Sequence, residues 1–178
     1  MACHIAATTT MDELVWVNDD DFESTFRAHY GRLVRALTIV AGSQDEASDA
    51  VQDAFVKAHL RWRTVSQYDD PVGWIRRVAI NKLKDEHRRT GRKNRAVERM
   101  GTQYRDSSAG EPVIDEMDQL LGELSRQQRL CVALFYVEQL STAEIAQTLD
   151  LSAGAVKFHL HRARERLRGL LTEEGLGQ

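Results

Sequence analysis

The sequence predicts an all-α fold of two small helical domains joined by a flexible linker, the second domain containing a helix-turn-helix. The 178 residues include only two prolines and 11 glycines, which argues against a β-rich chain. The long segments are rich in alanine, leucine, arginine, glutamate and glutamine, which favour helix. Apolar residues recur at helical spacing on both sides of one stretch of about twenty residues that lacks such spacing, and a stretch of this length marks a domain boundary.

After a disordered tail at residues 1–20, three helices are expected to form an N-terminal domain over residues 21–90. The first helix has an apolar stripe made of Phe22, Phe26, Tyr30, Leu33, Val34 and Leu37. Ser43 and Glu46 form a capping box that begins the second helix, which continues towards Trp62. Residues 63–70 lack periodicity and are expected to form a loop. Pro71, at a favoured first helical position, begins the third helix.

A linker is expected over residues 91–116 and a C-terminal domain over residues 117–173. The alternative for the basic N-terminal end of the linker is that it extends the third helix. Ser125 with Gln128, and Ser141 with Glu144, are two further capping boxes. The apolar pattern that follows Ser125 continues to about Glu138. A short helix after Ser141, a turn at residues 150–152 and a long helix complete the domain.

The composition excludes several classes of protein. The two cysteines lie in the expected tail and in an apolar helix, so no disulfide framework is predicted and a reducing cytoplasm fits. No apolar run approaches the roughly 20 residues that a membrane-spanning helix needs. The six histidines show no metal-ligand spacing with the cysteines, and no glycine-rich phosphate loop is present. We therefore expect a protein that is not an enzyme and that needs no metal or cofactor.

Charge is segregated along the chain although the net charge is only -3. Residues 76–99 contain ten basic and three acidic residues, and residues 157–168 contain five basic and one acidic residue. Residues 12–23, 45–53 and 106–123 contain acidic residues without lysine or arginine. Such segregation indicates basic faces for a polyanion and acidic faces for a protein partner.

Residues 141–168 have the pattern of a helix-turn-helix, in which the second helix projects far enough to enter a DNA major groove. Ser152 is placed to cap that helix. The positions expected to face duplex DNA are Ser152, Ala153, Gly154, Lys157, Phe158, His161 and Arg162. The alternative from these residues alone is a solvated, charged face on an ordinary helical hairpin.

Three segments together resemble the sigma-seventy family, and most closely its extracytoplasmic-function (ECF) group. Residues 47–58 are similar to the polymerase-binding helix of the family. Residues 74–81, with Asp85 and Arg88, are similar to its minus-ten recognition helix. Residues 151–157, with residues 161–164, are similar to its minus-thirty-five recognition helix. The resemblance implies an RNA polymerase sigma factor that directs promoter recognition and transcription initiation.

The resemblance also implies that this chain has a surface that docks on core RNA polymerase. The partner there would be the clamp helices of the β′ subunit, with the β subunit as a further contact. The residues that carry this role are Asp49, Gln52, Asp53 and, at the edge, Phe55. These acidic positions lie on adjacent helical turns with no basic residue nearby, which independently suits a basic protein surface. The alternative is a solvated face with Phe55 in the core.

For the minus-ten element, the resemblance implies capture of a flipped base of the melted strand by the loop before the third helix and by that helix. We assign single-strand capture to Gln67, Tyr68 and Asn81 and backbone contacts to Arg76, Arg77, Lys84, Arg88 and Arg89. Trp74 either stacks on a base or packs in the core. Departures from the family pattern at His59, Ala155 and Phe158 leave the promoter sequence open.

Other readings remain at this point. A stand-alone helix-turn-helix regulator would bind duplex DNA without polymerase, and a purely structural helical protein would bind no DNA. The interpretation as a stand-alone regulator does not explain why the highest density of basic residues lies outside the helix-turn-helix. The two basic faces argue against a purely structural protein. The resemblance further implies promoter DNA and an anti-sigma factor as partners.

Overall fold

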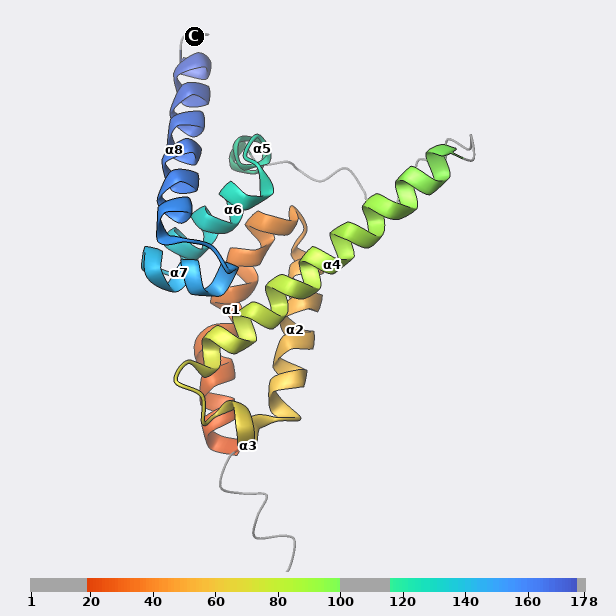
Figure 1. Cartoon of the computed structure of the whole chain (residues 1–178), viewed down its shortest axis with the longest axis vertical. Coiled ribbons are helices and arrows are strands. Elements are labelled where there is room, and N and C mark those ends of the chain that lie inside the picture. Colours follow the sequence, from red (N-terminus) through yellow and green to blue (C-terminus); the bar gives the residue numbers. More distant parts are fainter. Residues whose placement is uncertain (1–18, 100–115, 176–178) are drawn as a thin grey trace, which may run out of the picture.

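Figure 1 shows the computed structural model, which describes residues 19–99 and 116–175. These residues form helices and no strand, which confirms the all-α prediction. The elements are α1 (Asp19–Ala41), α2 (Gln44–His59), α3 (Trp62–Val65), α4 (Pro71–Arg99), α5 (Glu116–Gly122), α6 (Arg126–Val132), the π-helix η1 (Ala133–Val137), α7 (Thr142–Leu149) and α8 (Ala153–Gly175).

Local signals in the sequence set the helix ends of the N-terminal half. Gly42 ends α1 in the left-handed region, with φ of 74°, and its N–H donates to the carbonyl of Thr38. The hydroxyl of Ser43 accepts from the amide of Glu46 at 3.4 Å and caps α2. Pro71 begins α4 as predicted. In the segment expected to be a loop, α3 forms a single additional turn.

The C-terminal half follows the predicted caps closely. Both capping boxes are complete, at Ser125 and at Ser141. Asp150 ends α7 in the left-handed conformation, with φ of 57°. The hydroxyl of Ser152 then accepts from the amide of Ala155 at 3.1 Å at the start of α8. The turn between α7 and α8 is thereby fixed at both ends.

Two features differ from the expected course of the chain. The helix that the pattern carries to Glu138 finishes as the π-helix η1, and Gln139 follows with φ of 57°. Helix α4 continues to Arg99, into the segment expected to be a linker. The remainder of that linker, residues 100–115, and residues 1–18 of the expected tail lie outside the described residues.

The two halves pack against each other, a contact that the sequence did not predict. Helix α1 contacts α6 and η1, and α4 contacts α7 (Figure 1). Buried apolar residues form one cluster that runs from Leu33 in α1 to Ala163 in α8. We call this packing of α1 and α4 on α6, η1 and α7 the closed arrangement. Its apolar contacts favour association of the halves by removing hydrocarbon from water.

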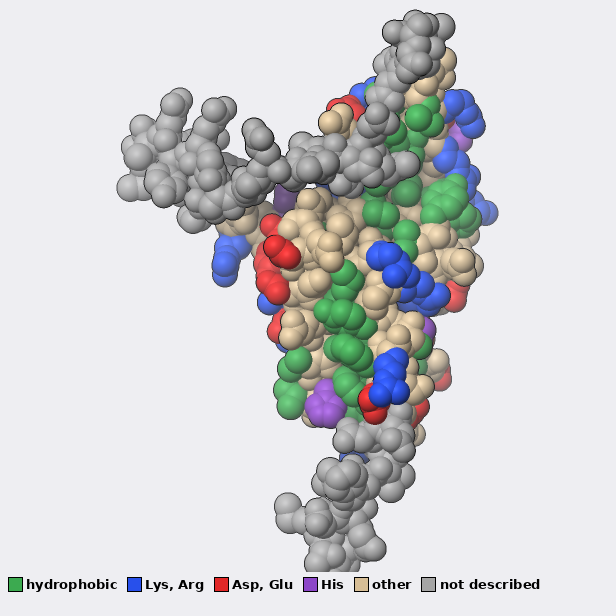
Figure 2. All heavy atoms as spheres, turned by 180° about the vertical axis from the view of Figure 1, so that it is seen from behind, with side chains coloured by type: hydrophobic (Ala, Val, Ile, Leu, Met, Phe, Trp, Pro, Cys, Tyr) green, Lys and Arg blue, Asp and Glu red, His purple; other side chains and the backbone are tan. Residues whose placement is uncertain are grey.

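The surface retains the charge segregation expected from the sequence. In the view of Figure 2, hydrophobic side chains form a strip along the length of the molecule. Basic side chains lie along one edge of its upper half, over α8, and acidic side chains lie along the opposite edge. Within residues 19–99 and 116–175, no helix combines the length and hydropathy that a bilayer crossing requires.

Candidate protein and nucleic-acid interfaces

One face of α2 carries acidic and amide side chains that are open to solvent. Asp49 and Gln52 are exposed, while Asp53 is half-buried. The carboxylate of Asp53 lies 3.0 Å from Nζ of Lys57 and 3.3 Å from Nζ of Lys82. These bonds, chiefly the one from Lys57, hold the pKa of Asp53 below its ordinary value. The expectation that no basic residue lies near these acidic positions is therefore wrong for Asp53, because Lys57 is one helical turn away and Lys82 reaches across from α4. Asp49 and Gln52 present the more accessible part of this face.

Phe55 does not belong to this face, which corrects the expectation that it lies at the edge of a docking surface. It is 2% exposed. Its ring packs edge-on against Phe26 at 5.1 Å and against Phe22 at 6.2 Å between centroids. The reason is helical periodicity, since Phe55 continues the apolar stripe of Val51 and Ala58 that faces the core. Trp62 is 5% exposed and likewise lies in the core.

Most of the side chains predicted to meet the minus-ten strand are accessible. Gln67 and Tyr68 are exposed in the turn after α3. Along α4, Asn81, Arg88 and Arg89 are exposed, and Lys84 is half-buried with a lowered pKa caused by burial and then by the nearby charge of Arg126. A shallow hollow of about 460 Å³ between α2 and α4 is lined by Lys57, Val78, Asn81, Lys82, Asp85, Glu86, Arg89 and Arg92. Trp74 is half-buried and packs against the core.

Two arginines expected on the DNA backbone are engaged elsewhere. Arg76 is 4% exposed, and its Nε donates to Oε2 of Glu138 at 3.0 Å. Nη2 of Arg77 donates to the carbonyl oxygen of Gln147 at 3.0 Å. The prediction that Arg76 is free to contact DNA is therefore wrong for the closed arrangement. Its guanidinium group is buried against Glu138 of the C-terminal half.

The helix-turn-helix brings all seven of its predicted DNA-facing residues to one exposed surface. Val156 and Leu160 of α8 are at most 3% exposed and belong to the same core cluster as Ile145 and Leu149 of α7. This packing fixes α8 and leaves its first turns projecting. The residues from Ser152 to Gly154, together with Lys157, Phe158, His161 and Arg162, are exposed. Phe158 is 59% exposed, which is unusual for a phenylalanine and leaves its ring free for an apolar contact.

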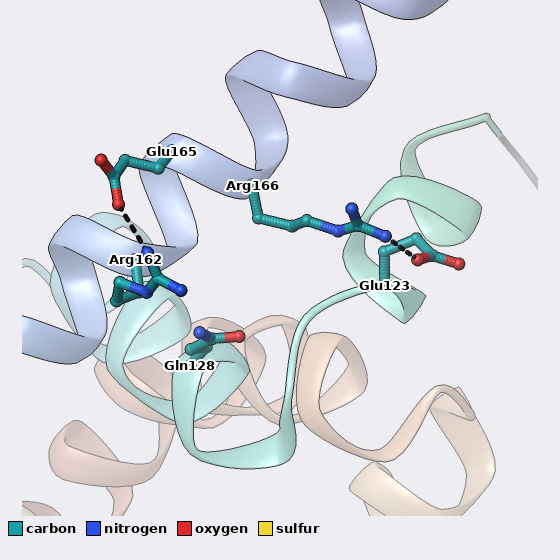
Figure 3. A pocket seen from close by; sticks show the side chains of 5 residues that line it. All are labelled: Glu123, Gln128, Arg162, Glu165 and Arg166. Carbon is teal, nitrogen blue, oxygen red and sulfur yellow. Dashed lines mark hydrogen bonds and ion pairs between the residues drawn. The ribbon is translucent and has the colours of Figure 1, made fainter.

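A second hollow, of about 450 Å³, lies where this surface meets α6 (Figure 3). Nη1 of Arg162 lies 3.2 Å from Oε2 of Glu165, and Nη2 of Arg166 lies 2.7 Å from Oε2 of Glu123. Gln128 completes the lining. Because two arginines face two glutamates, the hollow is close to neutral. The ion pair with Glu165 holds the guanidinium of Arg162 beside the exposed face.

The sequence did not single out Glu138 or Arg166. Arg166 could have been found from its basic neighbours on α8. Glu138 has no local signal, since its position depends on the π-helix and on packing between distant segments. In the described part of the chain, histidine, cysteine and carboxylate side chains form no group of three that could hold a metal ion.

Comparisons with known proteins match both halves. Residues 25–93 match the family described as Sigma-70 region 2, and residues 114–167 match the family described as Sigma-70, region 4. The RNA polymerase sigma-E factor of Streptomyces coelicolor is 32% identical over 165 residues, covering 88% of this chain and 89% of that protein. The ECF RNA polymerase sigma factor SigM of Mycobacterium tuberculosis is 30% identical over 151 residues, covering 84% of this chain and 76% of that protein.

Solved structures share the fold. The sigma factor RpoE of Bartonella quintana, in complex with the anti-sigma factor NepR, has a TM-score of 0.72 and 22% identity, covering 86% of this chain and 98% of that chain. CnrH, in complex with the cytosolic domain of CnrY, has a TM-score of 0.62 and 26% identity, covering 88% of this chain and 91% of that chain.

Proposed function

The chain belongs to the extracytoplasmic-function group of the sigma-70 family and is an RNA polymerase sigma factor, and from this premise we propose how its residues divide the work. Residues 21–90 dock on core polymerase and hold the melted minus-ten strand. Residues 117–173 read the minus-thirty-five duplex. The proposal rests on the observation that this one chain carries an exposed acidic face on α2 and an exposed basic face on α8.

Docking on core polymerase is assigned to Asp49, Gln52 and Asp53. A basic protein surface would pair with the two carboxylates, and the exposed position of Asp49 supports direct contact. The ion pairs of Asp53 with Lys57 and Lys82 hold its carboxylate in place at the junction of α2 and α4. Docking and minus-ten recognition therefore share a rigid element.

Capture of the minus-ten strand is assigned to Gln67, Tyr68 and Asn81, with Arg88 and Arg89 on its backbone. An exposed aromatic ring next to cationic side chains suits stacking on an unpaired base while the phosphates are neutralised. Lys84 adds a cation at the edge of this surface. Trp74 is half-buried and packs against the core.

Recognition of the minus-thirty-five duplex is assigned to the exposed face at the start of α8. Lys157 and Arg162 suit phosphates or guanine edges, and Phe158 suits a thymine methyl group. Ser152, Ala153 and Gly154 are small, so the beginning of the helix can approach the groove closely. His161 lies beside Arg162 on the same face.

We also propose an anti-sigma factor as a regulatory partner, because the fold is shared with a sigma factor found in such a complex. The protein itself performs no chemistry in this account. It acts in the bacterial cytoplasm, where core polymerase and promoters are found.

The proposal is tested by promoter binding measured with and without core polymerase. A sigma factor of this kind should bind a promoter fragment weakly alone and tightly as the holoenzyme. A stand-alone helix-turn-helix regulator should bind duplex DNA alone, as a dimer at paired half-sites. Tight dimeric binding without polymerase, unchanged when core enzyme is added, would overturn the proposal.

A further inference from the structure

One carboxylate on α8 contacts two neighbouring residues of the face assigned to the minus-thirty-five duplex. Oε2 of Glu165 lies 3.2 Å from Nη1 of Arg162, and its Oε1 lies 3.3 Å from Nε2 of His161. His161 and Arg162 precede Glu165 by about one helical turn, so the three side chains lie on one side of the helix. Figure 3 shows the guanidinium of Arg162 and the carboxylate of Glu165 turned towards each other. Each oxygen of Glu165 therefore contacts a different residue of this face.

Stability of α8 is a poor explanation for this arrangement. In a helix, an ion pair is more favourable when the acidic residue precedes the basic one, and Glu165 follows both of its partners. The side chain of Glu165 is 44% exposed and that of Arg162 is 60% exposed. Exposed pairs of this kind contribute little to folding, because water solvates both charges whether or not they meet. What the pair determines is the position of the Arg162 guanidinium.

The Arg162 guanidinium keeps donors that the protein does not use. Among the described residues, Arg162 bonds through Nη1 alone. A guanidinium has several N–H donors in a fixed plane, so Nη2 and the second hydrogen of Nη1 remain for another acceptor. Guanine presents two acceptors, O6 and N7, side by side in the major groove, and a fixed pair of arginine donors matches them. An arginine held in one orientation is therefore suited to a base edge.

Lys157 lies on the same face and is arranged differently. It is exposed in the first turns of α8, and no described carboxylate lies within ion-pair distance of its Nζ. Its ammonium is a compact charge at the end of a flexible aliphatic chain. Such a group neutralises a phosphate without selecting a base. The two basic residues of this face are therefore prepared for different partners.

We propose that Glu165 is a positioning residue that holds Arg162 for bidentate contact with a guanine of the minus-thirty-five duplex, and that leaves phosphate binding on this face to Lys157. The carboxylate also repels phosphates, which makes a neutral base edge the better partner for Arg162. This inference rests on the proposed function, because it needs the beginning of α8 to lie in the major groove. Base selection should then depend on Glu165, while the stability of the fold should not.

The test measures promoter binding by the holoenzyme, assembled from core polymerase and the full chain. The templates are a fragment that this holoenzyme transcribes and fragments in which each G·C pair of the minus-thirty-five element is replaced by A·T, one at a time. Discrimination is the ratio of the Kd of the replaced fragment to that of the original. The variant is Glu165→Gln, which removes the charge and keeps the shape. The matched control is Glu123→Gln, which loses the same charge at the other ion pair of the hollow in Figure 3.

The wild-type protein should discriminate by about tenfold or more at one G·C pair. Glu165→Gln should reduce discrimination at that pair by about threefold to fivefold, the range that an exposed ion pair supports. The slope of log Kd against log salt should become steeper by up to about 1, because the released Arg162 can bind a phosphate instead. Tm should change by no more than about 2 °C, as expected for a surface substitution. Glu123→Gln should keep the wild-type discrimination and slope.

A double-mutant comparison shows whether Glu165 acts through Arg162. Arg162→Ala should abolish discrimination at the same pair, and Glu165→Gln added to it should cause no further change. Wild-type discrimination and slope in Glu165→Gln, or an equal effect of Glu165→Gln with and without Arg162, would overturn the positioning role. A loss of discrimination that comes with a larger fall in Tm would also overturn it, since the role would then be structural.

The outcome for Arg162→Ala separates this inference from the proposed function. Discrimination that is lost in Arg162→Ala and intact in Glu165→Gln leaves the minus-thirty-five face in place and overturns the positioning role. Wild-type discrimination at every pair in Arg162→Ala, together with an unaltered salt slope in Lys157→Ala, refutes the assignment of this face to the minus-thirty-five duplex. The two failures are therefore distinguishable.

Discussion

Charge reversal of Asp49 is expected to weaken binding to core polymerase by about thirtyfold. Asp49 is exposed on α2 and forms no ion pair with the described residues, so Asp49→Lys should leave the fold intact. Two unit charges about 4 Å apart in water interact by about 1 kcal/mol. Reversal removes one such attraction and adds one such repulsion, a difference of about 2 kcal/mol in binding free energy, or about thirtyfold in Kd.

The assay is a competition titration in which the variant displaces a labelled wild-type protein from core polymerase. Asp69→Lys, an equal change of charge at an exposed position outside α2, serves as the control and should keep the wild-type Kd. The effect of Asp49→Lys should shrink as salt is raised, because solvated charges are screened. A change smaller than about threefold at low salt, with the control also unchanged, would refute the assignment of this face.

Three further predictions concern stability and DNA binding. Ser141→Ala removes the oxygen that accepts a hydrogen bond from the amide of Glu144 at 3.2 Å. The free energy of unfolding should therefore fall by about 1 kcal/mol, which thermal denaturation should register as a decrease of about 2–4 °C in Tm. An unchanged Tm would contradict the role of this cap. Lys157→Ala should lower the slope of log Kd against log salt by about 1 in promoter titrations of the holoenzyme, and an unaltered slope would exclude a phosphate contact. Burial, and then the charge of Arg32, lower the pKa of His29 below its ordinary value of 6.5. Just below pH 6.5 the unfolded chain therefore binds more protons at His29 than the folded chain does. The free energy of unfolding should fall as the pH drops below 6.5. Denaturant unfolding at a series of pH values should find a smaller loss of stability in His29→Gln than in the wild-type protein. Equal losses in the two proteins would contradict the lowered pKa of His29.

Local chemistry made much of the fold predictable from the sequence. Ser125, Ser141 and Ser152 each cap the helix expected of them, because capping depends on neighbours three residues away. The apolar stripe of α1 was likewise readable, since helical periodicity is a local property. The exposed face of the helix-turn-helix follows directly from these two kinds of signal.

Features that depend on contacts between distant segments were not predictable. Phe55 could belong either to the surface or to the core, and only its packing against α1 decides the matter. The burial of Arg76 depends on Glu138, which lies 62 residues away. A basic residue in a basic helix is expected to be solvated, and no local pattern indicates the carboxylate that covers it. The end of α6 passes into a π-helix where periodicity suggests a continuous α-helix.

Promoter-specific RNA synthesis tests the account most directly. Core polymerase is incubated with the purified protein and a library of promoter fragments, and the 5′ ends of the transcripts are mapped. The account predicts transcripts that begin at a defined position on a subset of templates and that vanish when the protein is omitted. Transcripts that begin at random positions, or none on any template despite active core enzyme, would contradict it.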